Sequence, residues 1–159
     1  MNNEIYPRQR HLISEIDSGL HFTVVGCGGT GFWVALLLAM SGARNINLFD
    51  PDHLELSNLN RLPLPRRVIN KSKTAILNAV IRHLRPECSV NTDALATNFS
   101  LDLYEHNILF DCTDRSTSQE LLYTYCREHN LIYIRCGYDG AHISITSHHS
   151  SWSNGEQDG

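Results

Sequence analysis

The sequence predicts an α/β protein built on a doubly wound, mostly parallel sheet with helices on both faces. Two observations indicate this fold class: strand-type and helix-type segments alternate along almost the whole chain, and a glycine-rich turn joins the first strand to the first helix. The 159 residues, 42% of them hydrophobic and 19% charged, suffice for one globular core. We expect one domain over residues 1–147, which begins with an N-terminal segment at 1–20, and a polar tail or shortened loop over 148–159.

The first strand-helix-strand unit is the clearest part of the pattern. Residues 21–26 (HFTVVG) are typical of a short buried strand, and residues 32–40 (FWVALLLAM) of a helix that is hydrophobic on nearly every face. Such a helix is expected inside the protein, with Trp33 in the core. Residues 45–50 (NINLFD) form the second predicted strand, which Pro51 ends.

The remaining elements follow the same alternation. A helix is predicted over 70–84, because its apolar residues recur at helical spacing and Pro86 follows. The later elements are a weak strand at 89–95, a short helical piece at 100–105, a strand at 107–111, a helix at 116–129, and strands at 131–136 and 141–146.

Composition excludes several function classes. A net charge of −4 and a pI of about 6.1 argue against a general nucleic-acid binder, which would carry a basic excess. The five cysteines form no C-x-x-C pair, which favours a reducing compartment and argues against structural zinc. Residues 22–43 lack charge, but the glycines among them favour a turn over a membrane helix, and no secretory signal is visible. We expect a cytoplasmic protein without a membrane segment.

The glycine-rich turn is the first candidate site. Glycines after a strand let the backbone approach a phosphate closely, and the free N–H groups of the following helix bind anions. Nineteen residues after the last glycine, Asp50 ends the second strand, where a carboxylate can accept the ribose hydroxyls of a nucleotide. The alternative is tight strand-helix packing, with Asp50 a turn residue. The glycines are Gly26, Gly28, Gly29 and Gly31.

A basic stretch is the second candidate. Between Leu56 and Pro86 the chain has no Asp or Glu but seven basic residues, including its only two lysines. Such an excess in an acidic protein favours a triphosphate over a dinucleotide, although a solvated helix face is the alternative. The seven residues are Arg61, Arg66, Arg67, Lys71, Lys73, Arg82 and Arg85.

The third candidate is the run Asp111-Cys112-Thr113-Asp114 at the end of a predicted strand. Mg²⁺ binds one or two carboxylates together with substrate phosphates, so an aspartate here suits a Mg·ATP site. For Asp111, capping of the following helix is the alternative. Cys112 and Cys136 adjoin apolar strand residues and are expected to be buried core thiols.

Taken in order, these motifs resemble the ThiF/MoeB family of ubiquitin-activating-enzyme-like adenylating proteins. The matching runs are VVGCGGTG, LFDPDHLELSNLNR, a lysine twelve residues after that arginine, and LFDCTD. The resemblance implies a Rossmann-like domain that uses Mg·ATP to adenylate the C-terminal glycine carboxylate of a ubiquitin-like protein, giving acyl-adenylate and pyrophosphate. It also implies a homodimer or pseudo-dimer.

The resemblance assigns roles to individual residues. Gly28, Gly29 and Gly31 would form the nucleotide turn, and Asp50 would hold the ribose. The phosphates would be bound by Asn58, Arg61 and Lys73, while Asp114 would hold Mg²⁺ with support from Asp111. The segment Tyr6-Pro7-Arg8-Gln9 is similar to the family's Tyr-x-Arg-Gln segment, so Arg8 would reach the partner subunit's ATP site across a dimer interface.

Some features depart from the family. Leu62 and Arg115 stand where glutamine and asparagine are usual, and the family's later substrate-binding strands, crossover loop and cysteine pairs are not visible. A non-catalytic or partial subunit that needs a partner chain is therefore one alternative. A tRNA-modifying relative is another. A NAD-binding oxidoreductase is the third, because Gly26, Gly28 and Gly31 also satisfy G-x-G-x-x-G.

Overall fold

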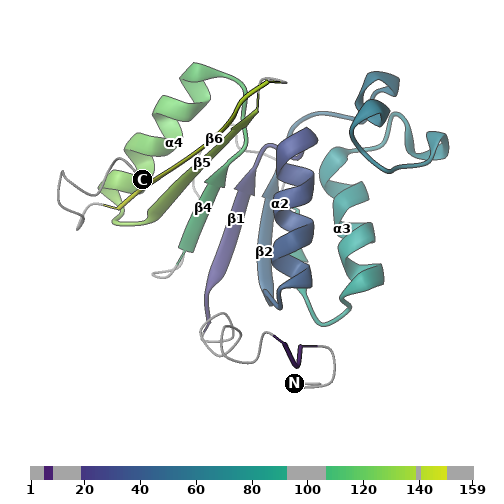
Figure 1. Cartoon of the computed structure of the whole chain (residues 1–159), viewed down its shortest axis with the longest axis horizontal. Coiled ribbons are helices and arrows are strands. Elements are labelled where there is room, and N and C mark those ends of the chain that lie inside the picture. Colours follow the sequence, from purple (N-terminus) through teal and green to yellow (C-terminus); the bar gives the residue numbers. More distant parts are fainter. Residues whose placement is uncertain (1–5, 9–18, 93–106, 139–140, 150–159) are drawn as a thin grey trace.

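The structure is a computed structural model that describes residues 6–8, 19–92, 107–138 and 141–149. Six strands within these ranges form one sheet in the order β3-β2-β1-β4-β5-β6, and of these only β6 runs antiparallel to its neighbour (Figure 1). The predicted mostly parallel α/β fold is confirmed. The strands are β1 (His21–Val25), β2 (Asn45–Phe49), β3 (Ser89–Asn91), β4 (Asn107–Asp111), β5 (Ile132–Tyr138) and β6 (Ile143–His148).

Helices cover both faces of this sheet. Helices α2 (Gly29–Met40) and α3 (Lys73–Leu84) lie on one face, and α4 (Ser116–Glu128) on the other. The two cores divide neighbouring strand residues between them: Val24 packs in the cluster with α2 and α3, whereas Val25 packs with α4. This division follows from the alternation of side chains along a strand, and it produces the doubly wound arrangement.

The chain before α3 differs from its prediction. The helix predicted from residue 70 begins at Lys73, because Asn70 has a φ of 66°, outside the helical region, and Ser72 caps the helix by accepting a hydrogen bond from the Ala75 N–H at 3.4 Å. Two short 3₁₀ helices precede it, η1 (Leu56–Asn60) and η2 (Arg66–Val68), and neither was predicted. The helical piece predicted at 100–105 lies outside the described residues.

Helix α2 corrects one prediction. Its inner side is buried as expected, with Phe32, Ala35 and Ala39 in the core. Its outer side carries Trp33 and Leu37, whose exposed fractions are 42% and 58%, so placing Trp33 in the core was wrong. A helix that is hydrophobic on every face presents apolar residues to solvent whenever only one face meets a sheet. Among the helices in the described ranges, none is long and apolar enough to span a membrane.

Candidate nucleotide site at the carboxyl edge of the sheet

The glycine turn lies where β1, β2 and β4 end. The Gly26 N–H donates to the Phe49 carbonyl at 2.8 Å, and the Cys112 N–H donates to the Val25 carbonyl at 2.8 Å. Gly26 has a φ of +88°, and a Cβ there would lie 2.8 Å from the Cys112 carbonyl oxygen. A Cβ at Gly31 would overlap the Gly26 carbonyl oxygen. These two glycines are therefore required by close backbone packing.

Gly28 has a different environment, because a Cβ built on it would meet nothing within 4 Å. Gly28 is the N-cap of α2, no side chain caps this helix end, and its first turn carries no acidic residue. The N–H groups of the first turn of a helix have no partner within the helix, and they attract anions. Open space before uncapped N–H groups fits a phosphate.

Asp50 connects the glycine turn to the segment after β2. Its side chain is buried, and one carboxylate oxygen accepts a hydrogen bond from the Cys27 N–H at 2.7 Å. The other oxygen accepts from the Asp52 N–H at 2.8 Å. The sequence suggested Asp50 as a ribose ligand and, as the alternative, as a turn residue, and these two bonds show the turn function. Each carboxylate oxygen retains a second lone pair, so the two functions are compatible.

Lys73 is brought beside Asp50 by a backbone connection. The Lys73 N–H donates to the Asp52 carbonyl, and the Leu54 N–H donates to the Lys71 carbonyl, which fastens the start of α3 to the chain after β2. The Lys73 ammonium then lies 2.9 Å from the Asp52 carboxylate and 3.8 Å from Asp50. Since Asp52 is exposed, a phosphate can replace it as the partner of this ammonium.

Arg61 lies on the other side of the glycine turn. Its Cδ and Nε atoms would be 2.7 Å from a Cβ on Gly29, so the side chain covers the first residue of α2. Its guanidinium donates to the Asn60 side chain at 2.9 Å. Asn58 has a local function that the sequence did not suggest, because its side-chain oxygen accepts the Glu55 N–H at 3.0 Å within η1.

The run from Asp111 to Asp114 contains one buried and one exposed carboxylate. Asp111 is fully buried and accepts hydrogen bonds from the Thr113 N–H at 2.9 Å, the Thr113 hydroxyl at 2.7 Å and the Tyr133 hydroxyl at 2.7 Å. Burial and this last bond raise the pKa of Tyr133. Asp111 thus shapes the loop and does not cap α4, whose N-cap is Arg115.

Asp114 is exposed and has no hydrogen bond or ion pair to any described residue. The described ranges also hold no group of three or more His, Cys, Asp or Glu side chains placed to bind a metal. A single free carboxylate suits Mg²⁺, which takes few protein ligands and completes its shell with water and phosphate oxygens.

Cys112 and Cys136 are half-buried neighbours, which corrects the expectation of buried core thiols. The parallel pairing of β4 with β5 sets Asp111 opposite Arg135, so the next residue of each strand is a cysteine. A hydrogen bond between the two thiols lowers the pKa of Cys136 and, together with burial, raises that of Cys112. Cys27, in the glycine turn, is buried, and burial raises its pKa.

The segment that contains Arg8 lies at the opposite end of the molecule. Tyr6, two residues before Arg8, donates a hydrogen bond to Glu87 at 3.2 Å, and the Arg85 guanidinium carbon lies 5.9 Å from the centre of its ring. Arg85 and Glu87 follow α3 and precede β3, at the amino edge of the sheet (Figure 1). The structure therefore does not bring Arg8 together with Asp50 and Lys73 of the same chain.

Most of the other basic residues also lie away from the glycine turn. Arg82 and Arg85 belong to the end of α3, a helix length away from Lys73, and Arg66 and Arg67 are exposed in η2. Only two of the seven basic side chains, those of Arg61 and Lys73, are shown in contact with the glycine turn or Asp50.

Comparison with known proteins gives a consistent result. The chain is 30% identical over 131 residues to tRNA threonylcarbamoyladenosine dehydratase of Haemophilus influenzae, covering 79% of this chain and 50% of that protein. It is 36% identical over 107 residues to the mouse adenylyltransferase and sulfurtransferase MOCS3, covering 65% of this chain and 23% of that protein.

Among solved structures, E. coli MccB with ATP superposes with a TM-score of 0.82 at 26% identity, covering 94% of this chain and 50% of that one. The chain spans about half the length of the first curated relatives that it matches. The family model described as "ThiF family" matches residues 13–153. On this match, which extends over most of the sequence, the chain belongs to the ThiF family.

Proposed function

We propose that this chain binds Mg·ATP at its glycine turn and adenylates the C-terminal carboxylate of a ubiquitin-like protein. One observation carries the proposal: the open helix start at Gly28 and the side chains of Asp50, Arg61 and Lys73 meet at one edge of the sheet. The site thus combines a phosphate cradle, a carboxylate for a ribose, and two cations. The match to MccB with ATP and the family membership support it.

The reaction joins a carboxylate oxygen to the α-phosphorus of ATP and breaks the bond from that phosphorus to the pyrophosphate oxygen. Its products are an acyl-adenylate and pyrophosphate. The attacking carboxylate is ionised at neutral pH, so no general base is required. The protein's contribution is to position the reactants and to stabilise charge on the phosphates.

Each residue has a specific part in this proposal. The Lys73 ammonium leaves Asp52 for a phosphate oxygen, and Arg61 moves from Asn60 toward the start of α2. Asp50 accepts ribose hydroxyls while it keeps its two backbone hydrogen bonds. Mg²⁺, which Asp114 would hold, neutralises phosphate charge when bound.

A second chain completes the proposed site. Because Tyr6, two residues before Arg8, is held at the amino edge of the sheet by Glu87, Arg8 would serve an ATP site in a partner subunit. We propose a homodimer or pseudo-dimer in which Arg8 of one subunit contributes to the ATP site of the other. The exposed apolar side of α2, with Trp33, Leu37 and Met40, is a surface that such an assembly would cover.

The main alternative acceptor is a modified tRNA, since the Haemophilus relative carries a tRNA substrate in its name. The chemistry at ATP would be the same. The net charge of −4 favours a protein acceptor, because a tRNA is bound through many phosphate contacts. A NAD-dependent oxidoreductase would bind NADH more tightly than ATP, and a non-catalytic subunit would bind ATP without exchange.

The test is ATP–pyrophosphate exchange with candidate ubiquitin-like tails and Mg²⁺. Lys73→Ala and Asp114→Ala should each reduce exchange by about 100-fold or more, because each removes a preorganised charge from phosphoryl transfer. Arg82→Ala is the matched control, an exposed cation at the far end of the helix that begins with Lys73, and it should change exchange little. Equal rates for the three variants would refute the site.

A further inference from the structure

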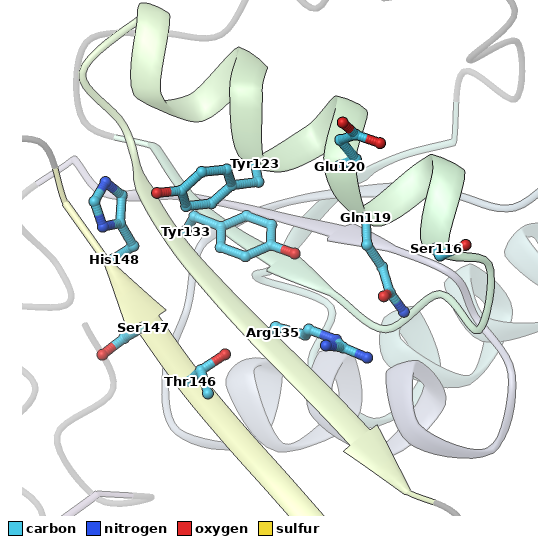
Figure 2. A pocket seen from close by; sticks show the side chains of 9 residues that line it. All are labelled: Ser116, Gln119, Glu120, Tyr123, Tyr133, Arg135, Thr146, Ser147 and His148. Atoms are coloured by element: carbon cyan, nitrogen blue, oxygen red, sulfur yellow. The ribbon is translucent and has the colours of Figure 1, made fainter. Parts of the chain in front are cut away.

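A second hollow lies on the α4 face of the sheet. It is a cavity of about 420 Å³ between α4, β5 and β6 (Figure 2). Tyr123 and Tyr133 pack edge to face in it, with ring centres 5.6 Å apart, while the other walls carry hydroxyl, amide and charged groups. Its volume falls within the range of about 300–1,000 Å³ that is usual for small-molecule sites.

Two side chains at this cavity have nitrogen atoms without a hydrogen-bond partner among the described residues: Arg135, which is exposed, and His148, whose ring packs against Tyr123. The Arg135 guanidinium makes no hydrogen bond or ion pair with the described residues, and the buried His148 Nε2 has no hydrogen-bond partner among them. Figure 2 shows Arg135 directed toward Gln119 at one end, and His148 beside Tyr123 at the other. A buried polar atom without a partner, such as the His148 Nε2, is uncommon in native proteins and is evidence for a ligand or water at that place, whereas the exposed Arg135 guanidinium is accessible to one.

The cavity shares its walls with the loop that ends in Asp114. The Tyr133 hydroxyl donates to Asp111, and the Gln119 side-chain amide donates to the Thr113 carbonyl at 2.9 Å. Arg135 is paired with Asp111 in the sheet, so its backbone lies at the level where β4 ends. A group bound by Arg135 is therefore next to the proposed magnesium loop.

We propose that this cavity receives the C-terminal residues of the acyl acceptor, with Arg135 binding the terminal carboxylate and His148 a preceding carbonyl oxygen. The inference rests on the proposed function and names the acceptor's subsite. A planar guanidinium binds a carboxylate through two parallel hydrogen bonds, which suits Arg135. Of the nine lining residues, Arg135 is the sole permanent cation, and Glu120 is an anion, which favours a peptide over RNA with its many phosphates.

The experiment measures peptide binding to the full chain without ATP. N-acetyl-triglycine with a free carboxylate, and the same peptide as its C-terminal amide, are titrated into ¹⁵N-labelled protein by NMR. We expect the carboxylate to shift the Gln119 side-chain amide signal saturably, and the amide to bind at least about tenfold more weakly. Arg135→Gln should remove this difference, whereas Arg127→Gln, an exposed guanidinium on α4, should keep it.

Several outcomes would overturn the subsite. Equal binding of the two peptides, or an undiminished preference in a folded Arg135→Gln variant, excludes the guanidinium as the carboxylate receptor. A melting curve verifies that Arg135→Gln is folded. Arg135→Lys keeps the positive charge but cannot donate two parallel hydrogen bonds, so it should retain part of the preference for the carboxylate. Displacement of the peptide by tRNA, with a steep salt dependence, would assign the cavity to RNA instead.

The two proposals fail separately. Carboxylate preference without ATP–pyrophosphate exchange would refute the adenylation activity and support the subsite. Exchange with an acceptor whose KM is unchanged by Arg135→Gln would support the activity and refute the subsite. Calorimetric ATP affinity should be equal in the native chain and in Arg135→Gln, because Arg135 contacts neither the glycine turn nor Lys73.

Discussion

Replacement of Asp50 by alanine should affect both stability and nucleotide binding. In the structure the buried carboxylate accepts the Cys27 and Asp52 N–H groups, so its removal leaves two donors without a partner. Each loss costs about 1–3 kcal/mol. For a chain of this size, about 2–4 °C per kcal/mol predicts a melting temperature at least about 4 °C lower. Loss of the ribose contact should further weaken ATP binding by about 2 kcal/mol, or about 30-fold in Kd.

The assay combines thermal melting by circular dichroism with calorimetric ATP titration below the melting range. Asp52→Ala is the matched control, because it removes a neighbouring carboxylate that is 65% exposed and, among the described residues, is shown paired with Lys73 alone. A surface ion pair contributes about 0–1 kcal/mol, so this variant should melt close to the native chain. Equal melting of Asp50→Ala and Asp52→Ala would refute the structural reasoning. Unchanged ATP affinity in folded Asp50→Ala would leave Asp50 as a turn residue alone.

Three further predictions concern other parts of the chain. Gly31→Ala should prevent soluble expression, because its Cβ overlaps a backbone oxygen, whereas Gly28→Ala should fold; equal yields would contradict the packing of the turn. Cys136 should be the first cysteine that iodoacetamide alkylates as the pH rises from 6. Its pKa is lowered, whereas the pKa values of the other four thiols are raised, so Cys136 forms thiolate at a lower pH. Peptide mass spectrometry gives the order of alkylation. Mixing Arg8→Ala with Lys73→Ala should restore exchange in up to about half the sites of each heterodimer, and no recovery in proven heterodimers excludes a trans role.

The fold was predictable because its signals are local. The strand before the glycine turn, the Asp50 strand end and the Asp111 strand end were all placed correctly, since short apolar runs with turn residues mark parallel strands. The meeting of Lys73 with Asp50 was not predicted from the strand pattern, because Lys73 begins a helix and is placed by its backbone hydrogen bond to Asp52.

What sequence reasoning missed depends on contacts between distant residues. The hydrogen bond from Tyr133 to Asp111 joins positions 22 residues apart, and neither residue type indicates in the sequence which residue it will bind. The exposure of Trp33 depends on which side of α2 meets the sheet, and a uniformly apolar helix carries no periodic signal for that choice. The cavity at Arg135 and His148 was likewise not predictable, because its lining residues come from three separate elements, α4, β5 and β6.

The apolar outer side of α2 has a consequence for how the protein behaves in solution. From Trp33 to Met40 the helix rises about 10 Å, so these side chains form one continuous strip. Sulfate and phosphate ions are excluded from protein surfaces and strengthen apolar association, whereas urea weakens it. The chain should therefore salt out early and bind to hydrophobic chromatography media, and its sedimentation should depend on both protein concentration and the anion of the buffer.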